Sequence, residues 1–393
     1  MGAAVAAAGL LGIAGCSSSG SSSSPPASSS SAGSGASSAT GSSASSSAGA
    51  SGNSFAIKQI VFGTTLKHSY QANGKGAMQT ESLSQPDDIV ALGGNLYVGF
   101  QNGVGSQGEV SPSGNLDSTL VEFTPSGSIV KQWDVTGKID GMGADPSTGE
   151  VIATVNEDSK SSLYTLANGT VTRYAYSSRL PHLGGTDAIA ADNGKLLVSA
   201  SAPGTDGKAP ASAPAVFVVT LNAGAKTASV APFFADNAKA AGVGADAGKT
   251  VTLALTDPDS SGIVPSGSPQ FAGDYMLNSQ GDEQLIFANA GGQDLHVLKV
   301  SSSVDDIAWA TSASGTLYTS DSAANTVDAI TGPFTPGTAY AAVTPCNANS
   351  APSTCPAPGY GVNYLGTIDL TTGTIGTVPI TGVVTPKGMV FVP

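Results

Sequence analysis

Charged and histidine side chains are scarce in this chain of 393 residues. It has 15 Lys and Arg against 28 Asp and Glu, which gives a formal charge of −13 at pH 7. Because phosphate neutralisation needs clustered cations, this balance argues against a nucleic-acid partner. The three histidines, His68, His182 and His296, are far apart in the sequence, and no Gly-x-Ser-x-Gly motif occurs. The spacing therefore defines no Ser/His/Asp or Cys/His catalytic set.

The N-terminal residues 1–15 carry no charge and contain a short apolar run. Such a run is typical of a secretory signal peptide and is too short for a membrane span. The segment Ile13-Ala14-Gly15-Cys16 resembles a bacterial lipobox, which implies cleavage before Cys16 and a lipid on its thiol. No Lys or Arg precedes the run, so we expect a basic segment upstream of the given start. The alternative is an Ala/Gly-rich disordered tail with a chance Cys.

Residues 16–53 are nearly all Ser, Gly and Ala and carry no charge. A segment without apolar periodicity cannot offset the entropy of ordering, so we expect a disordered tether. Residues 54–393 contain no second linker and are interpreted as one domain. The sequence thus predicts an exported, membrane-anchored lipoprotein, monomeric, at the cell surface or in the periplasm.

Cysteine is limited to three residues, of which Cys16 belongs to the predicted anchor. Cys346 and Cys355 lie in a loop rich in Pro, Ser and Asn, and no His or third Cys stands near them to complete a zinc site. An even pair in an exported chain predicts a disulfide between Cys346 and Cys355.

A hairpin pattern recurs between residues 86 and 393. Each copy opens with a small residue or Asp, continues into a short apolar strand, turns at Gly, Asp or Asn, and returns as a second strand. The six copies start at Asp87-Asp88-Ile89, Asp140-Gly141-Met142, Asp187-Ala188-Ile189, Ala241-Gly242-Val243, Asp305-Asp306-Ile307 and Lys387-Gly388-Met389. Further hairpins with period-2 strands lie between the copies, and helical periodicity is nearly absent.

This repeat predicts an all-β fold, a β-propeller of six blades, with five or seven blades as alternatives. The last copy, residues 387–392, has no room to complete a blade. We therefore expect it to pair with the strand near residues 55–62 and to close the ring, which removes the sheet edges.

The Pro386-Lys387-Gly388-Met389-Val390-Phe391 ending and the recurrent inner strand resemble the NHL-repeat and gluconolactonase-like six-bladed propellers, often found on bacterial lipoproteins. The resemblance covers nearly all of residues 54–393. It implies the propeller architecture. It places no lactonase active-site residue, and Lys387 stands where such propellers often have His or Asn-Gly.

Four copies carry a carboxylate at the same position: Asp87, Asp140, Asp187 and Asp305. A ring of carboxylates at one mouth of the channel can hold Ca²⁺ or another divalent cation. The alternative is a turn role, since Asp at a strand start accepts hydrogen bonds from its own following backbone. Ala241 and Lys387 interrupt the ring at the other two copies.

Two other motifs have simpler interpretations. Residues 257–262, Asp-Pro-Asp-Ser-Ser-Gly, resemble the start of a calcium loop, but Ser268 stands where the closing Glu is needed, so we expect a turn. The Gly-rich residues 103–108 match a dinucleotide pattern without a following helix and are rejected.

Two functions follow from these residues. The first is a membrane-tethered binding or scaffold module for a protein, a glycan or a small ligand, which needs no catalytic set. The second is a divalent-metal-dependent hydrolase or lyase of the lactonase-like kind, in which the Asp ring holds the metal and His182 serves as acid or base. The sequence analysis favours the binding module.

Overall fold

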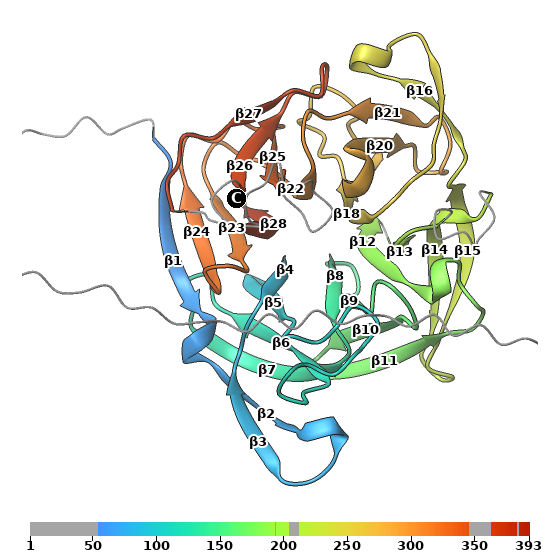
Figure 1. Ribbon diagram of the computed structural model, residues 1–393. Helices are drawn as coiled ribbons and strands as arrows, with labels where there is room; N and C mark the ends of the chain where they lie inside the picture. The colour runs from blue at the N-terminus through green and yellow to red at the C-terminus, as the bar shows by residue number, and fades with distance from the viewer. Residues whose placement is uncertain (1–53, 193, 204–211, 346–362, 383–384) are drawn as a thin grey trace, which may run out of the picture. The chain divides into compact units, whose positions relative to one another are not determined.

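The computed structural model describes residues 54–192, 194–203, 212–345, 363–382 and 385–393, except for the side chain of His182. Its regular elements are strands and short 3-10 turns, so the prediction of an all-β propeller is confirmed (Figure 1). No helix in these residues has the length and apolar character needed to cross a membrane. Cys16, Cys346 and Cys355 lie outside the described residues, and the lipid anchor and the disulfide stay predictions.

Six inner strands surround the centre of the propeller (Figure 1). They are β4 (Pro86–Leu92), β8 (Ile139–Asp145), β12 (Thr186–Asp192), β18 (Pro258–Ile263), β22 (Val304–Trp309) and β28 (Pro386–Val392). Each inner strand contacts the next in this order, and β28 contacts β4. The contacts close the ring, and each inner strand begins one blade, numbered 1 to 6 below.

Three further strands complete each blade outside its inner strand. Blade 1 adds β5 (Asn95–Phe100), β6 (Asp117–Phe123) and β7 (Ile129–Thr136); blade 2 adds β9 (Glu150–Val155), β10 (Ser162–Ala167) and β11 (Thr170–Tyr176); blade 3 adds β13 (Lys195–Ala200), β14 (Pro214–Asn222) and β15 (Thr227–Ala235). Blade 4 adds β19 (Tyr275–Ser279), β20 (Gln284–Ala288) and β21 (His296–Lys299); blade 5 adds β25 (Ala339–Val343), β26 (Tyr364–Ile368) and β27 (Ile375–Thr377); blade 6 adds β23 (Thr316–Asp321), β24 (Thr326–Thr331) and β1 (Ala56–Phe62). The outer strands of blades 2 and 3, β11 and β15, pair in parallel and join these blades into one eight-stranded sheet.

Smaller elements decorate the outside of the ring. The hairpin β16 (Lys239–Gly242) and β17 (Thr250–Thr252) extends blade 4, and the hairpin β2 (Lys67–Gln71) and β3 (Met78–Ser82) projects beside blade 1 (Figure 1). The 3-10 turns are η1 (Gly63–Thr65), η2 (Ala72–Gly74), η3 (His182–Gly184), η4 (Gly244–Asp246) and η5 (Gln280–Asp282). The tight hairpins use the expected turn residues: Asn168 and Gly169 adopt φ values of 49° and 74°, which a two-residue hairpin turn needs.

Side-chain hydrogen bonds join successive blades at the inner strands. Thr154 in blade 2 donates to the carbonyl of Asp187 in blade 3, and Asn278 in blade 4 donates to the carbonyls of Val304 and Asp305 in blade 5. Ser320 in blade 6 donates to the carbonyl of Asp87 in blade 1. These inner carbonyls have no sheet neighbour on the channel side, so donors from the adjacent blade satisfy them.

The hydrophobic core is divided among the blade interfaces. Each of six clusters of buried side chains draws mainly on two neighbouring blades, as Val98 and Phe123 of blade 1 pack with Tyr318 and Val327 of blade 6. Burial of one such side chain contributes about 1.5–3 kcal/mol. The stability of the ring is therefore distributed, and each blade depends on both neighbours.

The fourth repeat was predicted in the wrong place. Ala241 lies in β16, which belongs to an outer hairpin, and the inner strand of blade 4 is β18. The segment expected as a turn, residues 257–262, enters that inner strand at Pro258. The third residue of each predicted copy, such as Ile89, is apolar, but the corresponding residue of β18 is Ser261. The apolar pattern therefore led to the outer hairpin β16–β17 instead.

The expected pairing of the two chain ends is also wrong in detail. β28 and β1 share blade 6, but β23 and β24 lie between them, so that β28 pairs with β23 and β1 with β24. The hairpin β23–β24 is therefore inserted between β22 and β25 of blade 5 in the sequence while it belongs to blade 6 in space. A prediction from sequence repeats assumes that each blade is continuous in the sequence. The inserted hairpin β23–β24 breaks this assumption.

The contact between blades 6 and 1 generates a prediction. A β-carbon at Gly388 would lie 2.5 Å from the Cα of Asp88 and 2.6 Å from the carbonyl oxygen of Asp87, both rigid backbone atoms. Gly388→Ala should therefore lower the free energy of unfolding by about 3 kcal/mol or more, because the two inner strands must separate. In β18, by contrast, a β-carbon added at Gly262 would have no atom within 4 Å.

The matched control is Gly262→Ala, which should change the free energy of unfolding by less than about 1 kcal/mol. Chemical denaturation of both variants and the wild type checks the difference. Equal stability of the two variants would show that blades 6 and 1 do not approach as closely as described.

Candidate functional site

The second residue of each of the six inner strands described occupies an equivalent place. Asp87, Asp140, Asp187 and Asp305 are all buried there, with exposed fractions between 1 and 7%. The structure therefore brings the four predicted carboxylates together at one end of the channel. We call this end the channel mouth.

A fifth carboxylate at this level was missed by the sequence analysis. Asp259 is the second residue of β18, and it stands where Ala241 had been expected. The signal that could have found it is the Pro-Asp pair at Pro258, which matches Pro86 before Asp87 in blade 1. Lys387 occupies the same position in blade 6.

Amide and ammonium groups connect most of these carboxylates. Gln101 donates to Asp87 and, at 3.2 Å, to Asp140, while Gln280 donates to Asp259 at 3.2 Å and to Asp305 at 2.9 Å.

The Lys387 Nζ lies 2.5 Å from Asp305 Oδ1 and 4.0 Å from Asp87 Oδ1. Blades 4, 5, 6, 1 and 2 are thus linked at the mouth by alternating acceptors and donors.

A second lysine approaches the mouth from the loop before β8. The ammonium of Lys138 contacts Asp140 at 3.1 Å and also contacts Glu157, which follows the end of β9. Neither Lys138 nor Glu157 was singled out from the sequence, because both lie in loops whose direction the repeat pattern does not fix.

Asp187 differs from the other members of the ring. Its Oδ2 atom is buried and has no hydrogen-bond partner among the described residues. Ligand oxygens of Asp140, Glu157 and Asp187 all lie within 4.8 Å of one another. An unpaired buried carboxylate oxygen is costly, so this trio is the place in the mouth where a cation would be most stabilising.

The pKa shifts have one main cause. Burial raises the pKa of Asp87, Asp140, Asp187 and Asp259 above the usual 3.8, most strongly for Asp187 and Asp259, and neighbouring carboxylates add to the shifts. Burial and Asp140 raise the pKa of Glu157 to about 8.

Burial alone would lower the pKa of Lys138 and Lys387, but the surrounding carboxylates outweigh it and hold both pKa values well above 10.5. Both lysines are therefore cations at neutral pH and cannot act as bases.

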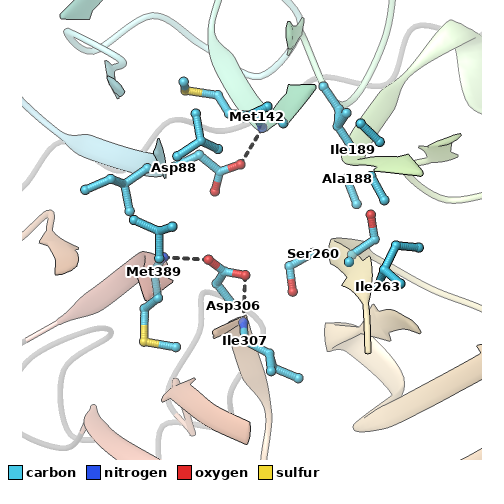
Figure 2. Close-up of a pocket in the computed structure, with 18 of the residues that line it drawn as sticks. Asp88, Met142, Ala188, Ile189, Ser260, Ile263, Asp306, Ile307 and Met389 are labelled. Carbon is cyan, nitrogen blue, oxygen red and sulfur yellow. Dashed lines mark hydrogen bonds between the residues drawn. The ribbon is translucent and has the colours of Figure 1, made fainter. Parts of the chain in front are cut away.

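A cavity of about 280 Å³ lies in the channel next to the mouth (Figure 2). All six inner strands line it, mostly with small or apolar residues. Asp88 and Asp306 extend into it and accept hydrogen bonds at 2.5 Å from the backbone N–H groups of Met142 and Met389, respectively. The channel thus contains a second, deeper pair of carboxylates.

His68 and His296, the histidines whose side chains are described, lie in different parts of the ring. His182 begins η3, directly before β12, but its side chain lies outside the described part of the chain. His68 is buried between Glu81 at 3.1 Å and Asp134 at 3.4 Å, beside blade 1, and His296 lies in β21 against Phe271. The scattered arrangement expected from the sequence holds for His68 and His296.

No protein-family model and no curated protein matches this chain. Among solved structures, it is similar to a Bacteroides caccae protein of unknown function, with 11% identity, a TM-score of 0.44, and coverage of 86% of this chain and 98% of that one. It is also similar to virginiamycin B lyase from Staphylococcus aureus (8% identity, TM-score 0.43, coverage 84% and 89%). A putative gluconolactonase is a third similar structure (12% identity, TM-score 0.37, coverage 70% and 92%). Likenesses this distant say nothing of what this chain binds.

The unpaired Asp187 generates a prediction about stability. Because its folded pKa is raised, ionisation of Asp187 destabilises the fold as pH rises above about 4. Asp187→Asn should therefore raise the melting temperature in excess chelator, more at pH 7 than at pH 4. Asp305→Asn is the matched control and should lower it, because Lys387 loses its nearest carboxylate.

Thermal unfolding at the two pH values measures both effects. A gain for Asp187→Asn that is the same at pH 4 and pH 7 would contradict the electrostatic explanation.

Proposed function

We propose that this propeller is a divalent-cation-dependent hydrolase or lyase whose cation is held at the channel mouth by Asp140, Glu157 and Asp187. The observation that carries the proposal is the buried Oδ2 atom of Asp187, which has no hydrogen-bond partner among the described residues and lies with two other carboxylates. Carboxylate oxygens are the ligands that Ca²⁺ and Mg²⁺ prefer, and three of them converge here.

The position of Asp259 favours the metal-dependent hydrolase or lyase over the binding module. Five inner strands place a carboxylate at the mouth, where the sequence had indicated four. Burial, together with the neighbouring carboxylates, raises the pKa of Asp187 and Asp259, and a divalent cation would offset both effects. The break at Ala241, which had weakened the metal hypothesis, does not exist.

The chain's own residues have separate roles in this proposal. When bound, the cation would polarise a carbonyl oxygen of the substrate. Gln101 fixes the carboxylate of Asp140 through its amide, and Lys138 donates from an ammonium that stays charged at neutral pH. Lys138 is thus placed to donate to an oxygen on which negative charge develops. His182, at the start of η3, is the proposed acid or base.

A binding module for a protein, a glycan or a small ligand is the second candidate. The observation that favours it is the set of contacts from Lys138, Lys387, Gln101 and Gln280, which already engage four of the five ring carboxylates. In this case the mouth is held together by protein groups, and ligand recognition falls to the loops.

Calcium titration separates the two candidates. Chelator-treated protein should bind about one Ca²⁺ per chain in calorimetry, with a rise in melting temperature through mass action. Asp187→Asn and Glu157→Gln should each weaken binding at least about tenfold, because a carboxylate ligand is lost. Asp294→Asn, on an exposed loop of blade 4, is the matched control and should bind like the wild type.

A panel of lactones and esters, assayed with Ca²⁺ and with chelator, then tests the chemistry. Turnover should require the cation and fall in the two site variants. Absence of Ca²⁺ and Mg²⁺ binding would overturn the proposal and leave the binding module.

We also propose that the protein is exported and anchored in the membrane by a lipid on Cys16, with residues 17–53 as the tether. The support is the apolar run, the lipobox-like residues and the Ser-rich composition that follows them. Cells fed a labelled fatty acid should incorporate label into the wild type and into Cys346→Ala, but not into Cys16→Ala. Equal labelling of all three proteins would refute the anchor.

A further inference from the structure

The cavity in the channel combines apolar walls with a few polar groups. Ala91, Ala144, Ala190, Ile263 and Val390 are among the residues that line it, each from a different inner strand. Pockets of this composition bind small organic ligands, with the polar groups fixing their orientation. The polar groups here are therefore the ones that define what the channel can bind.

The oxygen-bearing side chains that line the cavity are Asp88, Asp259, Ser260, Ser261 and Asp306, and three of them come from different blades. Figure 2 shows Asp88 from β4, Ser260 from β18 and Asp306 from β22 around the same space. Ser260 is only 8% exposed, and its hydroxyl has no partner at hydrogen-bond geometry among the described residues, although it lies near enough to Asp306 to lower the pKa of that carboxyl. A buried hydroxyl without a well-aligned partner is costly, so its position indicates an interaction supplied from outside the chain.

Among the residues that the structure describes, no salt bridge is formed by Asp88 or Asp306. Their known partners are backbone N–H groups: Met142 for Asp88, and Ile307 and Met389 for Asp306. Lys387 and Lys138 make their contacts with the ring at the mouth instead. Burial and mutual repulsion raise the pKa of Asp88, and burial raises that of Asp306 to about 6. A positive charge between the two carboxylates would remove this cost.

The geometry distinguishes an organic cation from a metal ion. Oδ2 of Asp88 and both oxygens of Asp306 already accept backbone hydrogen bonds, and the remaining walls are largely apolar. Among the described residues, the group of three acidic ligand atoms within 4.8 Å of one another is Asp140, Glu157 and Asp187, so the deeper carboxylates do not converge as a metal site does. A primary ammonium needs three acceptors, and Asp88, Asp306 and Ser260 are three. Its carbon chain would contact the alanine, isoleucine and valine walls.

We propose that the central channel binds a primary alkylammonium compound, with the ammonium held by Asp88, Asp306 and Ser260 and a short alkyl chain against the apolar walls. This site is separate from the cation site at the mouth, since it uses different residues. The first probe is n-butylammonium chloride, titrated calorimetrically into the full chain in excess chelator.

Two related probes resolve what is recognised. n-Butanol has the same chain without the charge, and tetramethylammonium has the charge without N–H donors. Each should bind at least about tenfold more weakly than n-butylammonium, since a charge-assisted hydrogen bond contributes about 1.5–3 kcal/mol. Equal binding of n-butanol would show that the carboxylates play no part and would overturn the proposal.

Variants locate the site. Asp88→Asn and Asp306→Asn should each weaken n-butylammonium binding at least about fivefold, because charge is lost while the side-chain shape is kept. Ser260→Ala removes a hydroxyl that makes no well-aligned hydrogen bond with the described residues, so it should fold normally and weaken binding about threefold or more. Asp294→Asn should bind like the wild type. Wild-type affinity in all three channel variants would overturn the proposal.

Variants test the Ca²⁺ site and the ammonium site independently of each other. Asp187→Asn should lose Ca²⁺ binding and keep n-butylammonium binding, while Ser260→Ala should do the reverse. Loss of n-butylammonium binding in Asp187→Asn, with Ser260→Ala unaffected, would place the ammonium at the mouth and contradict the channel site.

Discussion

The close contact between neighbouring inner strands is the constraint on which this structure depends. Gly388 permits the backbone of blade 6 to reach Asp88, and Gly141 permits the same between blades 2 and 3, where a β-carbon would meet the carbonyl of Asp187. Hydrogen bonds from Thr154 and Ser320 then satisfy the carbonyls at these contacts. The same geometry crowds the second residue of each inner strand around one axis, so electrostatic repulsion at the mouth follows directly from ring closure.

The channel handles this repulsion in two ways. At the mouth, Lys387 and Lys138 enter the carboxylate ring, and Gln101 and Gln280 donate between its members. Deeper in the channel, backbone N–H groups are the donors instead. At the mouth, side-chain donors reach the carboxylates of blades 4, 5, 1 and 2, whereas Asp187 Oδ2 in blade 3 has no hydrogen-bond partner among the described residues. The functional hypotheses rest on this asymmetry, because a buried charge that the protein leaves uncompensated is available to a ligand.

Much of the fold was predictable because the repeat has a physical cause. An inner strand needs a tight turn after it and a polar residue at its start, so five of the six copies and the carboxylates Asp87, Asp140, Asp187 and Asp305 could be read from the sequence. Asp259 was missed because Ser261 replaces the apolar residue in its strand. Glu157 and Lys138 were missed because loop residues carry no periodicity, and the unpaired state of Asp187 depends on partners from other blades. A motif in the sequence cannot show whether a buried carboxylate oxygen lacks a hydrogen-bond donor in the folded protein.

The hairpin β23–β24, which belongs to blade 6 but lies within the sequence of blade 5, affects the order in which the chain can fold. Blades 1 to 4 are each continuous in sequence and can form as soon as their residues are available. β23 gains its inner neighbour only when β28, the last strand, is present, and β1 has no sheet partner before β24 has been made. β1 thus stays unpaired until β24 is made, and the inner edge of β23 stays unpaired until β28 is made, so a nascent chain carries open strand edges in blade 6 until then. A protein that reaches its destination before it folds, as the predicted export signal implies, would complete blade 6 there.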